Sequence, residues 1–237
     1  MIKMVVFDMA GTTVDEDNVV YKTLQKAMLE SGFNFTLDQV LAEGAGKEKL
    51  QAIKSVLKVY GHTENHLLAD RIYNRFIELL AKAYQTQEII PQKNANELFR
   101  KLRERNILVA LNTGYNEETA ETIIRKLGWK KGLDYDDMIT ASDVKNNRPE
   151  PDMILLAMSR FGIRDAAEVI KVGDSIIDIQ EGKSAGCALN IGITTGAHTL
   201  QQLRSAEPDY VIDNLLELIP ILDKIGQAEA GHTLTKG

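Results

Sequence analysis

The sequence predicts an α/β protein in which a parallel sheet is flanked by helices and a helical segment is inserted after the first strand. Short runs that are apolar on both faces, typical of buried parallel strands, recur along the chain. They alternate with segments whose apolar residues repeat at helical spacing. Between residues 17 and 88 only the helical pattern is present.

The strand-like runs are short and most of them end at polar residues. The first covers residues 4–7 and stops at Asp8. The others cover residues 107–111, 169–172, 188–193 and 210–212. Because helical patterns and short loops connect these runs, we expect the strands to lie parallel in a single sheet.

The inserted segment carries signals for helix starts. Asp17 and Asn18 are placed to cap a first helix, and Thr36 with Gln39 forms a capping box of the S/T-x-x-E/Q type. Apolar stripes at helical spacing follow. The prediction therefore divides the chain into an α/β core of residues 1–16 and 89–237 and a helical cap domain of residues 17–88, with hinges near 15–18 and 85–91.

Composition excludes several classes of partner. The chain has 237 residues, of which 28 are Lys or Arg and 34 are Asp or Glu, for a net charge of −6. This balance argues against a broad surface for nucleic acid or anionic membranes. No run approaches the ~20 apolar residues of a membrane span. The single cysteine, Cys187, allows no intrachain disulfide, which fits a reducing cytoplasm.

Polar side chains follow the predicted strands at one edge of the sheet. Asp8 follows the first strand, Thr113 the second, and Asp174 the third, with Asp178 one helical turn later and Arg148 in a preceding loop. Ligands of open parallel sheets bind at the carboxyl ends of the strands. Carboxylates in an open oxygen geometry suit Mg²⁺, whereas a threonine and an arginine suit a phosphoryl group. Together the residues predict phosphoryl chemistry on an aspartate.

Four motifs occur in a fixed order and resemble those of the haloacid dehalogenase superfamily over residues 1 to 225. They are Asp8-Met9-Ala10-Gly11-Thr12-Thr13-Val14-Asp15, Asn112-Thr113-Gly114, Arg148-Pro149, and Gly173-Asp174-Ser175-Ile176-Ile177-Asp178. The resemblance implies a Rossmannoid core with a C1-type cap. It also implies a small phosphonate or phosphate-ester substrate, Mg²⁺ as cofactor, and an aspartyl-phosphate formed on Asp8.

The same resemblance assigns further residues to the site. The implied metal ligands are Asp8, the backbone carbonyl of Ala10, Asp174 and Asp178, and the last of these also suits a supporting place around the metal. The phosphoryl group would be held by Thr113, the amide of Gly114 and Arg148, in a turn shaped by Gly11 and Thr12, with Tyr115 at the mouth. The resemblance also implies a homodimer formed through cap helices.

Two residues narrow the resemblance to its phosphonoacetaldehyde hydrolase (phosphonatase) branch. Typical phosphatases of the superfamily carry an acid two residues after the nucleophile, where this chain has Ala10, and a lysine where it has Arg148. That branch breaks a C–P bond and uses a cap lysine as a Schiff base. Protonating an oxygen cannot help a carbanion to leave, whereas an iminium can accept its electron pair.

The candidate amine is Lys47, which occupies the Schiff-base position when aligned through Gly44. It follows a glycine turn and is expected to open a helix, where the helix N-terminus and Lys49 would both favour the neutral amine. Two expected partners, a methionine and a histidine, are replaced by Glu43 and Leu50. The expected substrate is therefore a related 2-oxo-alkylphosphonate, and a non-covalent contact by Lys47 or no role for it stays open.

Two other functions are compatible with the motifs. The first is a phosphomonoesterase of the phosphoglycolate or sugar-phosphate type, in which water or Thr12 replaces the acid missing at Ala10. The second, of a different class, is a non-catalytic phosphate-binding module. Comparing the hydrolysis of phosphonates and phosphate esters in parallel assays would distinguish these alternatives.

Overall fold

The central sheet consists of six parallel strands in the order β5-β4-β1-β6-β7-β8. The computed structural model describes the backbone of residues 1–234 and the side chains of residues 1–227. The strands are β1 (Met4–Asp8), β4 (Leu108–Thr113), β5 (Asp137–Thr140), β6 (Val169–Gly173), β7 (Leu189–Ile193) and β8 (Tyr210–Ile212). The predicted parallel sheet is confirmed, and all five predicted runs form strands of it.

Side chains of the central strand β1 are buried on both faces of the sheet. Val5 and Phe7 belong to the larger hydrophobic cluster, in which the ring of Phe7 lies 5.6 Å from that of Phe99. Met4 and Val6 point to the other face and pack in a second cluster with Met153 of α7. Alternate residues of a strand face opposite sides, so a run without polar residues needs helices on both faces.

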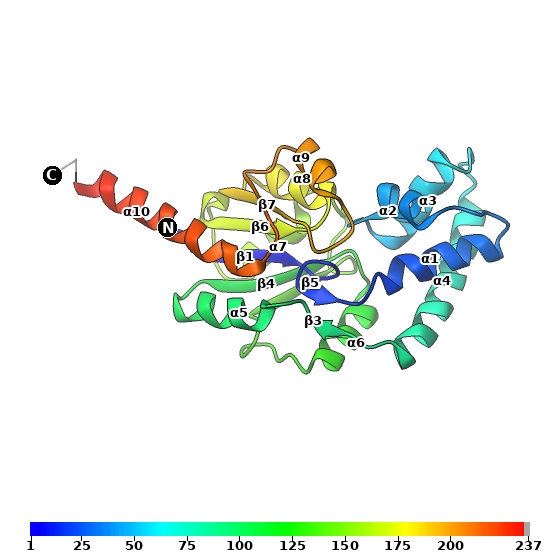
Figure 1. Ribbon diagram of the computed structural model, residues 1–237, viewed down its shortest axis with the longest axis horizontal. Helices are drawn as coiled ribbons and strands as arrows, with labels where there is room; N and C mark the ends of the chain where they lie inside the picture. Colours follow the sequence, from blue (N-terminus) through cyan, green and yellow to red (C-terminus); the bar gives the residue numbers. More distant parts are fainter. Residues whose placement is uncertain (235–237) are drawn as a thin grey trace.

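Helices cover both faces of the sheet (Figure 1). They are α5 (Ala95–Glu104), α6 (Glu117–Leu127), α7 (Asp152–Arg160), α8 (Ile176–Ala185), α9 (Leu200–Ser205) and α10 (Leu218–Leu234), with 3-10 turns η1 (Ala166–Glu168) and η2 (Leu215–Glu217). The chain therefore alternates strand and helix after residue 95, as the apolar patterns predict. The strand β5 is absent from that prediction, because it is a four-residue edge strand that begins with an acid.

Four helices lie together at one end of the molecule, beyond the carboxyl ends of the strands (Figure 1). They are α1 (Val19–Glu30), α2 (Leu37–Gly44), α3 (Lys49–Val59) and α4 (His66–Thr86), and we call this group the helical lobe. The short antiparallel strands β2 (Val14–Asp15) and β3 (Ile90–Pro91) flank it in sequence. The predicted domain limits at residues 17 and 88 lie next to these strands, and the division into domains stays a prediction.

The helix starts of the lobe match the sequence signals in part. The predicted capping box at the start of α2 is present, with the Thr36 side chain accepting from the Gln39 amide and the Gln39 side chain accepting from the Thr36 amide. The capping prediction for Asn18 is wrong, since this residue has a left-handed conformation and its side chain makes no capping hydrogen bond. Helix α1 therefore starts from a turn in the backbone.

The helix predicted to begin at Lys47 begins two residues later. Glu48 is the N-cap of α3, and its carboxylate accepts hydrogen bonds from the amides of Leu50 and Gln51. Lys47 consequently lies in the loop before the helix, and Lys49 is the first helical residue. The carboxylate at this N-terminus satisfies the amides that would otherwise face solvent.

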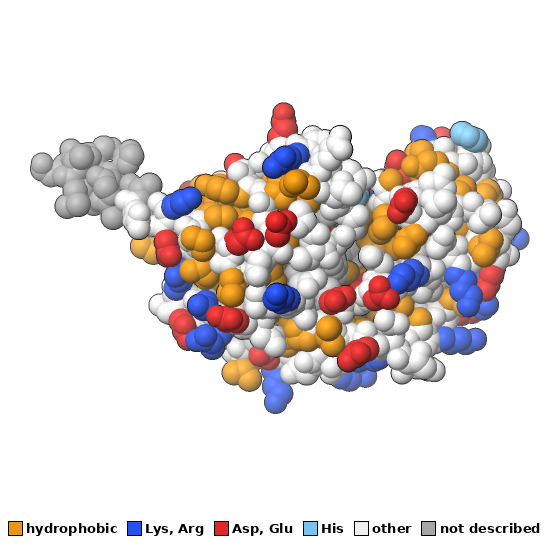
Figure 2. Space-filling model, viewed as in Figure 1, with side chains coloured by type: hydrophobic (Ala, Val, Ile, Leu, Met, Phe, Trp, Pro, Cys, Tyr) orange, Lys and Arg blue, Asp and Glu red, His pale blue; other side chains and the backbone are white. Residues whose placement is uncertain are grey.

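The outer surface has charges of both signs. On the face shown in Figure 2 the acidic and basic side chains are interspersed. This distribution agrees with the small net charge of the chain and gives no basic stripe on that face. Among the described helices, none is long and apolar enough to cross a membrane.

Candidate active site

Three aspartates meet at the carboxyl ends of adjacent strands. Asp8 is the last residue of β1, Asp174 follows β6, and Asp178 lies in the first turn of α8. Each offers a carboxylate oxygen within 4.8 Å of the others, and all three side chains are buried. The structure thus brings together the acids that the strand-end argument predicts to converge.

Arg148 connects these acids to the neighbouring strand. Its side chain is 1% exposed, and its Nη1 atom lies 2.7 Å from Oδ1 of Asp8 and 3.0 Å from Oδ1 of Asp178. Its Nε donates to Glu181 at 2.9 Å, and its Nη2 donates to both oxygens of Asn112. The guanidinium is therefore fixed from several directions before any ligand binds.

Lys171 is a second buried cation, which sequence reasoning did not identify. Its Nζ lies 3.0 Å from Asp178 and 3.0 Å from Glu181, and it donates to Oδ1 of Asn112 at 2.6 Å. The signal was available, because a lysine in the middle of a buried strand is rare unless it is paired. Glu181 also follows Asp178 by three residues on α8, which places both acids on one helical face.

The buried charges of the site do not balance. Arg148 and Lys171 face four carboxylates, those of Asp8, Asp174, Asp178 and Glu181. Although burial alone would raise the pKa of Asp178, the charges of the two cations bring it below its ordinary value. Burial, together with the nearby acids Asp8 and Asp178, raises the pKa of Asp174 well above its ordinary value.

The excess of negative charge fits a hard cation beside Asp8 and Asp174. Asp174 accepts one strong hydrogen bond, from the Ala197 amide at 2.6 Å, and a long one of 3.5 Å from the Thr12 hydroxyl. A side chain added at Gly11 would lie 2.5 Å from Oδ2 of Asp174, so this glycine leaves room for the carboxylate. Oxygen-only donors of this kind are the ones that Mg²⁺ or Ca²⁺ prefers.

In the turn after β1, several backbone amides form hydrogen bonds within the turn itself. The amides of Thr12 and Thr13 donate to the carbonyl of Met9, and the amide of Gly11 donates to Val14. Ala10 lies in this turn and is partly buried. The Thr13 hydroxyl donates to the carbonyl of Asp8 at 2.9 Å. These bonds fix the backbone around the nucleophile candidate, and the predicted contacts of Ala10, Gly11 and Thr12 with ligands stay predictions.

The segment after β4 lies against the helical lobe. Thr113 is buried and its hydroxyl accepts from the Tyr115 amide at 3.2 Å. A side chain added at Gly114 would lie 2.6 Å from the carbonyl oxygen of Lys47. The Tyr115 hydroxyl donates to Oε1 of Glu16 at 2.7 Å, and its ring is buried. The loop of Lys47 thus rests directly on the strand end that carries Thr113.

The Lys47 side chain is held within the lobe. Its Nζ donates to the Ser55 hydroxyl at 3.1 Å and lies 3.9 Å from Glu43, with 22% of the side chain exposed. Burial lowers the pKa of Lys47, and Glu43 opposes this shift. Within the described contacts, none joins this ammonium to Asp8 or Arg148. The prediction that Lys49 helps to neutralise Lys47 has no support here, because burial is the cause.

Lys49 is the more deeply buried of the two lysines. Its side chain is 6% exposed, and its Nζ donates to the carbonyl of Lys47 at 2.9 Å. The same atom lies 5.1 Å and 4.9 Å from the ring centres of Tyr21 and Tyr115, at distances typical of cation–π contacts. Burial lowers the pKa of Lys49 from 10.5 to about 8, while the negative charge of Asp8 opposes the shift.

A buried carboxylate connects the core to both ends of the lobe. Glu16 lies between β2 and α1 and accepts hydrogen bonds from the hydroxyls of Tyr84 in α4 and Tyr115 after β4, at 2.6 and 2.7 Å. Burial raises the pKa of Glu16, and the two hydroxyls oppose the shift. Sequence reasoning missed this residue, because its partners are distant in the chain.

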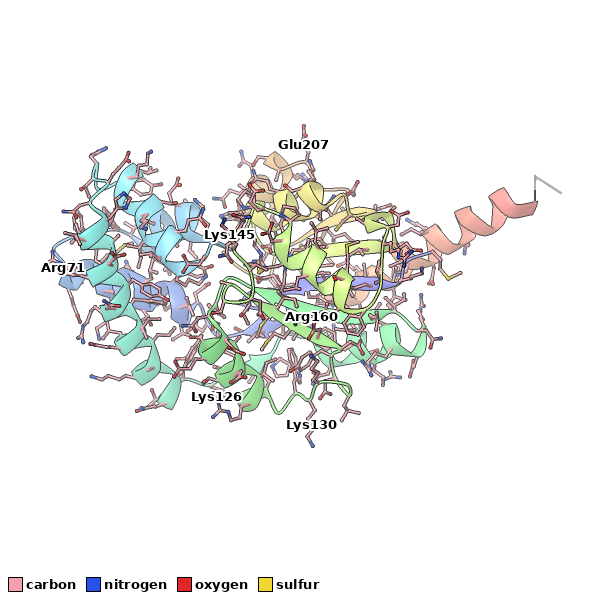
Figure 3. The ribbon with its side chains drawn as sticks, turned by 180° about the vertical axis from the view of Figure 1, so that it is seen from behind. Arg71, Lys126, Lys130, Lys145, Arg160 and Glu207 are labelled. Carbon is pink, nitrogen blue, oxygen red and sulfur yellow. The ribbon has the colours of Figure 1, made fainter. Side chains whose placement is uncertain are left out.

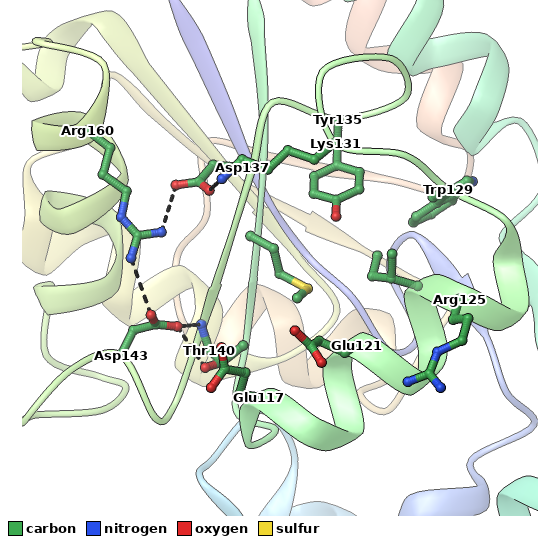
Figure 4. A pocket seen from close by; sticks show the side chains of 12 residues that line it. Glu117, Glu121, Arg125, Trp129, Lys131, Tyr135, Asp137, Thr140, Asp143 and Arg160 are labelled. Atoms are coloured by element: carbon green, nitrogen blue, oxygen red, sulfur yellow. Dashed lines mark hydrogen bonds and ion pairs between the residues drawn. The ribbon is translucent and has the colours of Figure 1, made fainter.

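A hollow of about 590 Å³ lies elsewhere, at the outer edge of the sheet beside β5. In the view from behind, Arg160 lies on the core and Arg71 on the lobe (Figure 3). The close-up of the hollow shows Arg160 reaching both Asp137 and Asp143 (Figure 4), at 2.9 and 3.2 Å. These charges satisfy one another and the hollow does not include Asp8, so the strand-end cluster is the better candidate site.

The fold and the strand-end cluster define a class of hydrolases. The family model of the haloacid dehalogenase-like hydrolases matches residues 5–191 of this chain. The chain therefore belongs to this family and is an enzyme of the hydrolase class. The resemblance drawn from the four motifs is confirmed.

Proteins named as phosphonoacetaldehyde hydrolases and as a phosphatase are among those similar to this chain. The chain is 28% identical to the phosphonoacetaldehyde hydrolase of Latilactobacillus sakei, over 98% of each chain. It is 29% identical to "Probable phosphatase IndB" of Dickeya dadantii, over 92% of this chain and 93% of that protein. A phosphonoacetaldehyde hydrolase-like protein from Oleispira antarctica has the same fold, with a TM-score of 0.81 at 22% identity over 95% and 93% of the chains.

The contact between the lobe and the core predicts an effect of Gly46→Ala. A side chain there would lie 2.4 Å from Ser175 and Ile177, so the lobe would be pushed from the core. We expect kcat/KM for p-nitrophenyl phosphate to fall by roughly 10²-fold, since small displacements of positioning groups have effects of this size. Gly32→Ala is the matched control, because Gly32 also has a positive φ but open space around it. Equal losses in both variants would contradict this account.

The buried ammonium of Lys49 predicts a pH-dependent gain in stability for Lys49→Met. Since its pKa falls from 10.5 to about 8 on folding, the charged form destabilises the folded state by on the order of 3 kcal/mol below pH 8. This penalty disappears as the pH rises from 8 toward 10.5. Urea denaturation of wild type and variant should show a gain at pH 7 that shrinks by pH 10. A variant less stable than wild type at pH 7 would refute the shift.

Proposed function

We propose that this enzyme is a Mg²⁺-dependent hydrolase that takes a phosphoryl group onto Asp8 and cleaves the C–P bond of a 2-oxo-alkylphosphonate. The observation that carries the proposal is the buried pair of Asp8 and Arg148, 2.7 Å apart, combined with an alanine at position 10. A carboxylate held beside a fixed guanidinium is placed to meet an anionic phosphoryl group. Without an acid at position 10, the turn has no carboxylic acid that could protonate a leaving alkoxide directly.

The Mg²⁺ ion would be held by Asp8 and Asp174, with the Ala10 carbonyl and Asp178 as further predicted contacts. When bound, the ion would neutralise charge on the phosphoryl oxygens. Asp178 is already paired with Arg148 and Lys171, which favours a supporting role for it. Asp174 lacks such a cation among the described ion pairs, which makes it the strongest candidate partner of Asp8.

The proposed reaction balances in three stages. The neutral Lys47 amine first condenses with the carbonyl of the substrate, taking up one proton and releasing one water molecule, to give an iminium. An Asp8 oxygen then forms a bond to phosphorus while the C–P bond breaks, and the electron pair of that bond passes into the iminium, giving an enamine. Water then hydrolyses the aspartyl-phosphate to inorganic phosphate and frees Asp8. Protonation of the enamine carbon and hydrolysis of the imine release the methyl ketone or aldehyde and the lysine. Arg148, Thr113 and Gly114 are the proposed holders of the phosphoryl oxygens.

Lys47 is the proposed Schiff-base amine. Its support is its place in the sequence after Gly44 and the lowering of its pKa by burial, which favours the neutral amine at neutral pH. Its side chain would have to leave Ser55 to reach a substrate. We also propose that residues 17–88 act as a cap that excludes water from the aspartyl-phosphate. The predicted homodimer and cytoplasmic location stay predictions.

A phosphomonoesterase is the second candidate. The observation in its favour is the buried hydroxyl of Thr12, which lies next to Asp174 and could stand in for the missing acid through a water molecule. A relative named as a phosphatase is consistent with it. A non-catalytic phosphate-binding module is disfavoured, because the chain belongs to a family of hydrolases.

Substrate preference and Ala10→Asp separate the two candidates. We expect wild type to release phosphate from 2-oxo-alkylphosphonates faster than from alkyl phosphates. Ala10→Asp should raise kcat/KM for alkyl phosphates by roughly 10²-fold or more, since it supplies a general acid. Asp8→Asn is the control and should lose both activities. Efficient hydrolysis of alkyl phosphates by wild type, with no phosphonate turnover, would favour the phosphomonoesterase.

Borohydride trapping tests the role of Lys47. Reduction during phosphonate turnover should leave a stable adduct on the peptide that contains Lys47, identified by mass spectrometry. Lys47→Arg should abolish both the adduct and C–P cleavage while Mg²⁺ and inorganic phosphate still bind. If no adduct forms at Lys47 with any phosphonate that is cleaved, the Schiff-base assignment fails.

A further inference from the structure

Lys49 stands apart from the other charged residues of the helical lobe. Within residues 17–88, all of which are described, it is the one charged side chain that is buried. Charged side chains on a solvated lobe normally stay at the surface, and a buried lysine normally has a carboxylate partner. Among the described residues, no carboxylate lies within ion-pair distance, 4.0 Å, of its Nζ atom.

The hydrogen-bonding capacity of Lys49 is only partly used. An ammonium has three N–H groups, and the one described acceptor for this residue is the carbonyl of Lys47 at 2.9 Å. The rings of Tyr21 and Tyr115 flank the ammonium and stabilise its charge without accepting a conventional hydrogen bond. A buried donor without a partner is unfavourable, so this arrangement indicates a ligand that supplies the missing acceptor.

The surroundings of Lys49 place it at the strand ends. Tyr115 directly follows the loop of Thr113 and Gly114, and the carbonyl of Lys47 that Lys49 contacts lies against Gly114. Arg148 donates to the carbonyl of Gly46 at 3.3 Å, so the loop that Lys49 contacts also touches the guanidinium beside Asp8. Glu16 fixes the Tyr115 hydroxyl and so acts as a positioning residue for the ring beneath the ammonium.

We propose that Lys49 binds an oxygen of the organic half of the substrate, a carbonyl or carboxylate on the carbon next to the one bonded to phosphorus. The proposal deepens the proposed function and rests on Asp8 as the residue that meets the phosphoryl group. The phosphoryl oxygens already have Arg148 and the predicted metal site, whereas the lobe offers one buried cation for the remainder of the ligand. Lys49 then determines specificity by holding this oxygen when the substrate first binds, before the Lys47 amine adds to the carbonyl carbon and the oxygen leaves as water.

A site built around a hydrogen bond rejects ligands that lack the matching group. If a bound ligand has no acceptor for the Lys49 ammonium, the ammonium stays buried without a hydrogen bond, and this desolvation cost weakens binding of that ligand. We therefore expect the enzyme to prefer phosphonates with an oxygen at this position over hydrocarbon analogues of the same size. The preference should depend on Lys49 and be independent of Lys47.

The test uses two ligands that cannot form an imine. Phosphonoacetate carries a carboxylate at the position in question, and propylphosphonate has a methyl-terminated chain of similar size. Calorimetric titration of the full chain with Mg²⁺ should give a Kd for phosphonoacetate about 10–10²-fold lower than that for propylphosphonate. Lys49→Met should remove most of this preference and leave the propylphosphonate Kd nearly unchanged.

Lys47→Met is the matched control, because Lys47 lies two residues before Lys49, in the loop that precedes α3, and this variant should keep the preference. Lys49→Arg retains the charge and should keep part of it. Melting temperatures of all variants show whether they fold. If Lys49 has a purely structural role, Lys49→Met should weaken the binding of both ligands equally. The proposal is overturned if wild type shows no preference, or if Lys49→Met retains it.

Combined with the assay of phosphonate cleavage, this titration separates the role proposed for Lys49 from the proposed C–P hydrolysis. If the wild-type enzyme cleaves no phosphonate but prefers phosphonoacetate, and Lys49→Met lacks this preference, the proposed C–P hydrolysis is wrong and the role of Lys49 stands. If wild type cleaves 2-oxo-alkylphosphonates and Lys49→Met keeps the preference, C–P hydrolysis stands and the role of Lys49 is wrong.

Discussion

The buried guanidinium of Arg148 is the interaction on which the rest of the site depends. It contacts Asp8, Asp178 and Glu181 at once, and it also holds the carbonyl and side chain of Asn112. Removing one member of such a buried set leaves uncompensated charge, which typically destabilises a protein by about 3–5 kcal/mol. The same geometry prevents Arg148 from swinging away from Asp8. The nucleophile candidate therefore has a fixed partner before a substrate arrives, which is the kind of preorganisation that favours transfer of an anionic group.

The sheet explains why this network can be buried. Strands β4, β1 and β6 are adjacent: Asn112 and Asp8 lie at the ends of β4 and β1, and Lys171 reaches Asn112 from the middle of β6. Parallel strands end at one edge, so polar residues placed at the ends of apolar runs meet there without interrupting the core. The lobe then covers this edge with the loop of Gly46 and Lys47, which contacts Ser175 and Gly114. Stability and chemistry are thus served by different parts of the same strands.

The sequence was sufficient for the sheet, the convergence of the acids and the place of Arg148, because these follow from strand ends and motif spacing. It was insufficient where tertiary contacts decide. The edge strand β5 lacks the apolar run of a central strand, since it begins with Asp137, an acid that pairs with Arg160. In the sequence Lys49 is indistinguishable from a surface lysine, and its burial depends on Tyr21 and Tyr115, which are distant from it in the chain. The role of Glu16 depends on hydrogen bonds from two tyrosines that are 68 and 99 residues away in the chain.

The central claim is that Asp8 receives the phosphoryl group. The direct measurement is acid quenching of the enzyme with Mg²⁺ and a cleaved phosphonate or phosphate ester during the first turnover, followed by mass spectrometry of the peptides. The account predicts a phosphorylated peptide that contains Asp8, forming and decaying at rates that match turnover, and its absence in Asp8→Asn. Turnover of the same substrate with no phosphorylated peptide at any time, or with the phosphoryl group on another residue, would contradict it.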